Sequence, residues 1–405
     1  MKRNTFALGY ALFIYIIMMV LIVTLIPFRF RVPEKIFVLW AGSVADVIEN
    51  IALFLPIGFL YRLLRRESDS GLGGRELRFG LLLSLTIELA QIFLDGRYTS
   101  VSDVLTNGAG AWIGAYIYRR VTTIIHEQRV VTLFALELPL MNIVYFLIPL
   151  VWLNGLAAEG ELARLWLLPV VGVFATGVMV SIYAHRLHDT SAVSAAHIVV
   201  FSVAWFLFSS IPALVKYPQA WPYIGMTSVI ITAATMLRLR FLPVLRRGER
   251  RFEVATLKRL LPLYLCYLAL LALWTPAADF GKWHFTFHLY GLDDYALTFQ
   301  YRFIEMVAAF TLLGYMLAEM RGRTEESAAH ALTMVFFLSV SAALVFQVLR
   351  GFHPSDSFNL LGVMILTLAG SYGAVIYRLQ LAAIRQLKSR PVSARFYGQI
   401  RAFQG

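Results

Sequence analysis

Residues 84–110 read "SLTIELAQIFLDGRYTSVSDVLTNGAG" and combine an apolar run with an unusual set of polar side chains. The run begins as a membrane helix would, yet Glu88 lies inside it and Arg97 and Asp103 follow closely. Each ionisable group placed in hydrocarbon costs about 2.5–3.5 kcal/mol on insertion scales, so such groups usually pair, face a cavity or take part in function. The stretch therefore predicts a membrane helix with a polar site at its end.

The composition of the whole chain agrees with a membrane environment. Of the 405 residues, 59% are hydrophobic and 15% are charged, and the mean hydropathy is +0.70. A soluble domain carries about 25% charged residues. Several apolar runs reach about 20 residues, the length that crosses a bilayer of about 30 Å as a helix. We therefore expect an all-α, polytopic helical membrane protein.

The apolar runs predict twelve membrane helices and a topology. The expected spans are 6–27, 45–64, 79–95, 102–120, 131–152, 164–184, 193–213, 222–238, 258–276, 299–320, 329–349 and 358–380. With the N-terminus inside, nine of the 36 basic residues fall outside: Arg29, Arg31, Lys35, Arg97, Arg164, Lys216, Lys282, Arg302 and Arg350. Cytoplasmic loops are enriched in Lys and Arg, so both termini are expected in the cytoplasm, with the chain in the inner (cytoplasmic) membrane.

The enrichment of Lys and Arg in cytoplasmic loops also accounts for the formal net charge of +12, so no nucleic-acid partner is expected. The single cysteine, Cys266, excludes a disulfide within the chain. His185 and His188 are three residues apart but lack further ligands nearby in the sequence, so no metal site is predicted. No cofactor is expected either.

A faint internal repeat divides the chain. "DVIENIALFLPIGFL" from Asp46 and "RFIEMVAAFTLLGYM" from Arg302 align without a gap. The same register sets Gln91 opposite Gln347 and Glu88 opposite Leu344. Eight spans separate the two copies, which predicts a parallel repeat. The expected domains are a four-helix domain at 1–125, a central four-helix region at 126–250, a second copy at 251–382 and a basic cytoplasmic tail at 383–405.

The predicted topology gathers polar side chains from three helices at the outer face. Asn50 lies in the first turns of the second span, and Glu88 and Gln91 lie on one face near the end of the third span. Asp103 and Asn107 share a face at the start of the fourth span, and Ser100 or Ser102 is placed to cap it. Arg97 falls in the short loop between these two helices.

These residues also carry a resemblance to a known family. "ENIALFLPIGFL", followed by "LLLSLTIELAQIFLDGRYTSVSDVLTNGAGAWIGAYI", resembles the VanZ-like family in both the order and the spacing of its polar and glycine positions over about residues 7–122. The matching positions are Asn50, Pro56, Gly58, Glu88, Gln91, Arg97, Asp103, Asn107 and Gly110. The second copy, at about 257–382, departs from the pattern, with Met306 opposite Asn50, so its site is expected to be inactive or altered.

The resemblance implies an integral membrane protein of a bacterial-type cell envelope. The founding member of the family is linked to resistance to the glycopeptide antibiotic teicoplanin. The resemblance implies no settled biochemical activity.

Three interpretations of the polar cluster stay open. In the first, the polar groups bond to one another and lock the helices. In the second, Arg97, Asn50, Gln91 and Asn107 bind an anionic or lipid-linked envelope intermediate among the membrane lipids, with Glu88 and Asp103 as the catalytic acid–base groups if a reaction occurs. In the third, the protein is a transporter built from parallel repeats. The ligand, any reaction and the oligomeric state stay open.

A second polar group lies in the second copy. Glu305 with Arg302, His353 and Asp356 would form another cluster at the outer face if all four side chains turned together. The sequence favours the alternative, in which His353 and Asp356 are solvated loop residues.

Overall fold

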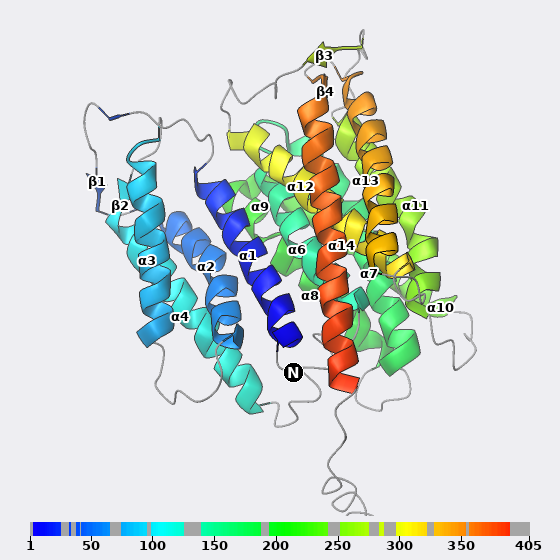
Figure 1. Ribbon diagram of the computed structural model, residues 1–405, viewed down its shortest axis with the longest axis horizontal. Coiled ribbons are helices and arrows are strands. Elements are labelled where there is room, and N and C mark those ends of the chain that lie inside the picture. Colours follow the sequence, from blue (N-terminus) through cyan, green and yellow to red (C-terminus); the bar gives the residue numbers. More distant parts are fainter. Residues whose placement is uncertain are drawn as a thin grey trace, which may run out of the picture.

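The computed structural model describes residues 3–25, 32–33, 38–40, 42–64, 74–94, 99–124, 139–187, 194–241, 252–274, 283–286, 297–321, 328–353 and 356–388. Figure 1 shows them as a bundle of helices, with short strand pairs at the end of the bundle opposite the N-terminus. We call this end the strand end.

The first part of the chain contains α1 (Arg3–Leu25), β1 (Val38–Leu39), α2 (Val44–Leu64), α3 (Gly74–Gln91), β2 (Thr99–Ser100) and α4 (Val101–Ile124). The central part contains α6 (Pro139–Leu156), the short turns η2 (Leu162–Leu167) and η3 (Tyr183–Leu187) around α7 (Leu168–Ile182), then α8 (Ala195–Ser209), α9 (Ile211–Lys216), η4 (Pro218–Ala220) and α10 (Trp221–Arg240). The last part contains α11 (Phe252–Leu273), β3 (Phe285–Thr286), α12 (Leu297–Arg321), α13 (Ala328–Arg350), β4 (Phe358–Asn359) and α14 (Leu360–Lys388).

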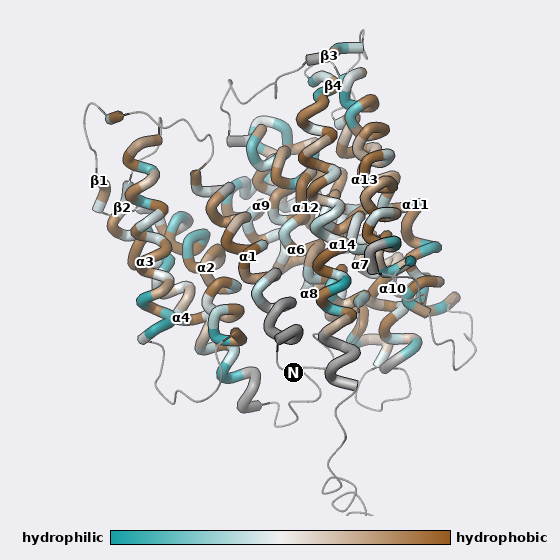
Figure 2. Tube along the Cα trace, in the orientation of Figure 1, coloured by the Kyte–Doolittle hydropathy of each residue, from teal (hydrophilic) through white to brown (hydrophobic). Residues whose placement is uncertain are grey.

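The prediction of a helical membrane protein is confirmed. A helix occurs at the position of each predicted span, and in the described part of the chain eight helices are long and apolar enough to cross a membrane. Figure 2 shows the hydrophobic stretches along the helices of the bundle. The apolar parts of α1 and α8 are shorter. Residues 131–138 of the fifth predicted span lie outside the described residues. The count of twelve spans and the cytoplasmic termini stay predictions.

The seventh predicted span, 193–213, is two helices rather than one. The helix α8 ends at Ser209, and α9 begins at Ile211 with Pro212 in its first turn. Proline lacks a backbone N–H and clashes with the preceding turn, so it begins a new helix more readily than it continues one.

The interior of the bundle is built by the central and last parts. In α7 and α12, 78% of the most apolar window is buried, against 17% in α2. The helices α2, α3 and α4 therefore form the edge of the bundle in Figure 1. The helix α1 joins this edge to the interior, because Tyr15 stacks on Tyr372 of α14 and packs edge-on against Phe146 of α6.

Glycines allow α2 and α4 to pack backbone against backbone. A Cβ atom at Gly58 would lie 1.8 Å from the Ala111 carbonyl oxygen, and one at Gly114 would lie 2.0 Å from that of Leu55. Such distances are far below van der Waals contact, so only glycine fits, as small-residue packing between membrane helices requires.

The helices α12 and α14 pack in the same way. A Cβ atom at Gly314 would lie 1.8 Å from the Gly370 carbonyl oxygen, and one at Gly373 would lie 1.9 Å from that of Thr311. Two short ladders are present among the described residues: β1 pairs with β2 in parallel, and β3 pairs with β4 in parallel, each over two residues.

The gapless register between the third and eleventh spans stays a prediction, and the ends of the two helices suggest another. At the end of α3 the Ile92 N–H donates to the Glu88 carbonyl at 3.2 Å, and at the end of α13 the Gly351 N–H donates to the Gln347 carbonyl at 3.0 Å. Counted from these backbone bonds at the helix ends, Gln347 corresponds to Glu88, whereas the gapless register sets Leu344 opposite Glu88.

Candidate functional site

Glu88 lies in the last turn of α3 and is only 3% exposed. Its Oε2 atom accepts a hydrogen bond of 2.8 Å from the backbone N–H of Ser100. The Thr99 hydroxyl donates to the Glu88 carbonyl at 3.1 Å. Thr99 and Ser100 form β2 and directly precede α4, so the carboxylate fixes the end of α3 against the start of α4.

A chain of hydroxyl groups extends from Ser100 to Asp103. The Ser100 and Ser102 hydroxyls are 2.8 Å apart, and the Ser102 hydroxyl donates to Asp103 Oδ1 at 3.1 Å. The Gly42 N–H donates to the Ser102 hydroxyl at 3.1 Å, which ties the segment before α2 to the same place. Asp103, in the first turn of α4, is half-buried.

Asn107 lies one turn further along α4 and is 4% exposed. Its Nδ2 donates to the Ser84 hydroxyl at 2.9 Å, and Ser84 in turn approaches the Asp103 carbonyl at 3.5 Å. The Asn107 Oδ1 atom is buried and has no hydrogen-bond partner among the described residues. We call the group formed by Ser84, Glu88, Ser100, Ser102, Asp103 and Asn107 the Glu88 cluster.

The structure brings three of the six predicted site residues together: Glu88, Asp103 and Asn107. Gln91 instead donates to the Thr24 carbonyl at 2.9 Å and so holds α1 against α3. Asn50 is half-buried on α2, and among the described residues its side chain makes no hydrogen bond to the cluster. Arg97 lies outside the described residues.

The serines are the part of the site that the sequence analysis did not assign to it. Ser84 lies one helical turn before Glu88, so the two side chains share a face of α3. That spacing is a signal by which Ser84 could be found. Ser100 and Ser102 were predicted only as caps of the following helix. The hydrogen bond from the Ser100 backbone N–H to Glu88 could not be predicted, because the pattern of side chains in the sequence does not show which backbone groups come close to a carboxylate.

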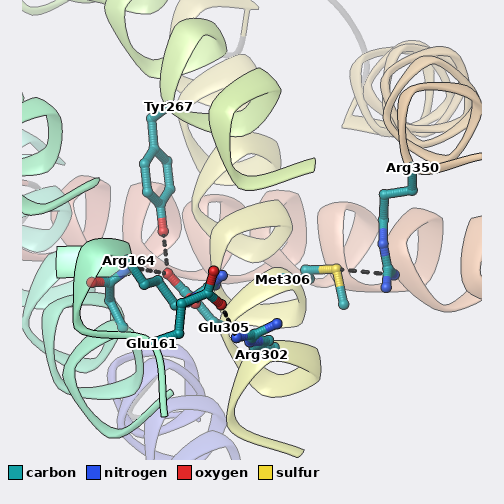
Figure 3. Close-up of polar contacts among 8 residues, drawn as sticks. Glu161, Arg164, Tyr267, Arg302, Glu305, Met306 and Arg350 are labelled. Atoms are coloured by element: carbon teal, nitrogen blue, oxygen red, sulfur yellow. Dashed lines mark hydrogen bonds and ion pairs between the residues drawn. The ribbon is translucent and has the colours of Figure 1, made fainter. Parts of the chain in front are cut away.

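A second buried polar group joins the central part of the chain to the last part. Arg164 of η2 and Glu305 of α12 form an ion pair of 2.5 Å, and their side chains are 2% and 0% exposed. Asn154 donates to Glu305 Oε1 at 3.0 Å, and the Tyr267 hydroxyl donates to the same atom at 2.8 Å. Figure 3 shows Arg164 and Tyr267 converging on Glu305. We call these four residues the Glu305 network.

The cluster of Arg302, Glu305, His353 and Asp356, which the sequence left as the less favoured possibility, does not form. Arg302 pairs with Glu161 at 2.6 Å, and Asp356 pairs with Arg350. His353 is 5% exposed, so the alternative of a solvated loop residue is also wrong for it. The physical reason is that a fully buried carboxylate needs a buried cation, and Arg164 supplies it from the central part.

No group of three metal-ligating side chains lies close together in the part of the chain that the structure describes. The arrangement around Glu88 thus offers carboxylate, amide and hydroxyl oxygens together with backbone N–H groups. Such groups hold and transfer protons or form hydrogen bonds with a ligand.

Comparison with known proteins bears on the part of the chain that holds this cluster. The VanZ/LLP1 family model matches residues 7–126. A similar curated protein is Protein VanZ of Enterococcus faecium, 31% identical over 77 residues, which are 19% of this chain. The chain spans 46% of the length of that relative. No solved structure matches the chain. Residues 7–126, which contain the Glu88 cluster, are therefore similar to the VanZ/LLP1 family.

Proposed function

We propose that this VanZ-like protein binds an anionic or lipid-linked component of the cell envelope at the outer leaflet of the cytoplasmic membrane. The ligand would contact the Glu88 cluster, with Arg97 and Asn50 as further binding groups. Resistance to a glycopeptide antibiotic of the teicoplanin type is the phenotype that we propose for this binding.

One observation carries the proposal: the carboxylate of Glu88 is buried at the end of α3, close to the start of α4, where the amide oxygen of Asn107 lacks a partner among the described residues. We propose that α3 lies in the membrane, although it is not one of the eight helices that are long and apolar enough to cross it. A charged side chain at the centre of a membrane helix costs about 2.5–3.5 kcal/mol, which is an upper bound for Glu88 in the last turn of α3. Hydrogen bonds between membrane helices average about 0.6 kcal/mol. Helix packing alone is therefore a weak reason for Glu88, and the free Asn107 oxygen offers an acceptor to a donor group of a ligand.

The side chains suit different parts of such a ligand. Arg97, two residues before Thr99 in the sequence, would pair with a phosphate or carboxylate, for which a guanidinium is well shaped. Glu88 and Asp103 would accept protons or hydrogen bonds from hydroxyl or amide groups. Gln91 supports the site indirectly, because its side chain holds α1 in place.

We also propose that the chain contains a duplicated unit. The paired glycines of α2 with α4 and of α12 with α14, together with the two parallel ladders, support a second copy at 251–382. The central region at 126–250 would then join the copies, and the basic tail at 383–405 would follow them in the cytoplasm.

Replacing Glu88 by glutamine tests the proposal. Glutamine keeps the volume and one oxygen for the Ser100 N–H, so the protein should fold and its unfolding free energy should change by less than about 1 kcal/mol. It cannot ionise or take up a proton, so we expect at least a tenfold loss of co-purified envelope lipids. Mass spectrometry of the lipids bound to the purified protein is the measurement.

The matched control is Glu76→Gln, at the other end of the same helix. Glu76 is buried as Glu88 is, at 2% exposed, but it pairs with Arg62 at 2.9 Å, away from the cluster. This variant should retain the same lipids as the wild type, and Arg97→Ala should lose them. Equal lipid profiles in all four proteins would show that the cluster is only structural.

A further inference from the structure

A pocket lies between α12, α13, β4 and α14 at the strand end of the bundle. Its enclosed volume is only about 20 Å³, room for a group the size of one water molecule, and the pocket is partly open on one side. Apolar walls come from Phe299, Phe303 and Leu366, and polar groups come from Gln347 and Arg350. It lies in the last part of the chain and shares no residue with the Glu88 cluster.

Gln347 places an unused acceptor in this pocket. Its side chain is 2% exposed, and its Oε1 atom has no hydrogen-bond partner among the described residues. A Cβ atom at position 362 would lie 2.3 Å from Gln347 Nε2, so Gly362 leaves the space that the amide fills. A buried acceptor without a partner costs about 1–3 kcal/mol, which a bound donor would recover.

Arg350 places a donor in the same pocket. Its Nε atom donates to Asp356 Oδ2 at 3.2 Å, and Nη2 donates to Asp356 Oδ1, so the ion pair leaves the pocket close to neutral. The Nη1 atom donates to the Met306 sulfur at 3.3 Å, and Figure 3 shows this contact. A thioether is a weak acceptor, so a ligand oxygen would replace it at little cost.

Gln347 lies at the end of α13 in a position that matches the position of Glu88 at the end of α3. Gln347 ends α13 through the same backbone turn by which Glu88 ends α3. A neutral amide therefore stands where the first part of the chain has a carboxylate. The Glu88 cluster contains an ionisable carboxyl group, whereas the pocket has the neutral amide of Gln347 at the matching position. We therefore expect the two sites to bind ligands of different charge.

We propose that this pocket is a second binding site, which takes a neutral hydroxyl group carried on an apolar molecule. The hydroxyl donates to Gln347 Oε1 and accepts from Arg350 Nη1, because a hydroxyl is both donor and acceptor. Only the hydroxyl fits the enclosed space, and the carbon skeleton stays on the open side of the pocket, which half-buried Phe299 and Phe303 help to line. An anion gains little here, because Asp356 already neutralises Arg350.

The test compares probes that differ only in this hydroxyl. The full chain in lipid nanodiscs is loaded with dioleoylglycerol, with its acetate ester, or with dioleoylphosphatidic acid, and retention is measured by native mass spectrometry. One hydrogen bond from a buried donor or acceptor corresponds to about a fivefold to tenfold difference. We expect dioleoylglycerol to be retained about tenfold better than its ester and better than the anion.

Variants and a soluble probe complete the test. Gln347→Leu and Gly362→Ala should each lower retention of dioleoylglycerol about tenfold, whereas Ser341→Ala, an exposed position on the same helix, should not. Free glycerol that displaces dioleoylglycerol would identify a soluble polyol as the source of the hydroxyl. Equal retention of alcohol and ester by the wild type overturns the proposal without reference to any variant, and leaves the pocket to a water molecule.

Discussion

The Glu305→Leu variant should unfold about 3–5 kcal/mol more easily than the wild type, the cost usual for removing one partner of a buried ion pair. Arg164 is 2% exposed and would keep its charge without a counter-ion. Asn154 and Tyr267 would lose their acceptor at the same time. The measurement is the unfolding free energy of the purified protein in mixed micelles, from denaturant titration followed by helical circular dichroism.

Two further variants separate the charge from the packing. In Glu305→Leu with Arg164→Met no charge stays buried, so much of the lost stability should return. Glu159→Gln removes a surface partner of Lys216, a pair whose side chains are 48% and 24% exposed, and should cost less than about 1 kcal/mol. If Glu305→Leu proved as mild as Glu159→Gln, the network would not hold the central helices to α12.

Alanine at Gly58 or at Gly314 should be the second most damaging change. Each new methyl group would lie 1.8 Å from a carbonyl oxygen of the facing helix, so the two backbones must separate. Overpacking of a close-packed interior costs typically about 1–3 kcal/mol and more where backbone blocks relaxation, so we expect at least about 3 kcal/mol. Thermal unfolding in detergent measures both variants.

The control for these glycines lies in α10. A Cβ atom at Gly225 meets nothing within 4 Å, so Gly225→Ala should be neutral or stabilising by up to about 1 kcal/mol, the helix preference of alanine over glycine. A loss at Gly225 as large as at Gly58 would mean that helix contact is not the cause. Similar losses at Gly58 and Gly314 would agree with two units of one design.

The helices were predictable because apolar length is a local property of the sequence. The contact of Glu88 with the start of α4 was predictable in part, since Asp103 and Asn107 follow it at helical spacing in the next span. The hydrogen bond that the Ser100 N–H donates to Glu88 was not predictable. Ser100 lies in a parallel strand pair of only two residues, which is too short to show the alternating apolar and polar pattern of a strand. The pairing of Arg164 with Glu305 joins residues 141 apart in sequence, and no local pattern encodes such a contact.

The stacking of Tyr15 on Tyr372 has a consequence for biosynthesis. The ribosome delivers α1 to the membrane before α14, so α1 must wait for this partner until all the helices between them have been translated. During that interval the aromatic face of α1 is open to lipid or to whatever assists insertion. A chain cut short before α14 would leave that face uncovered and would be a natural substrate for membrane quality control.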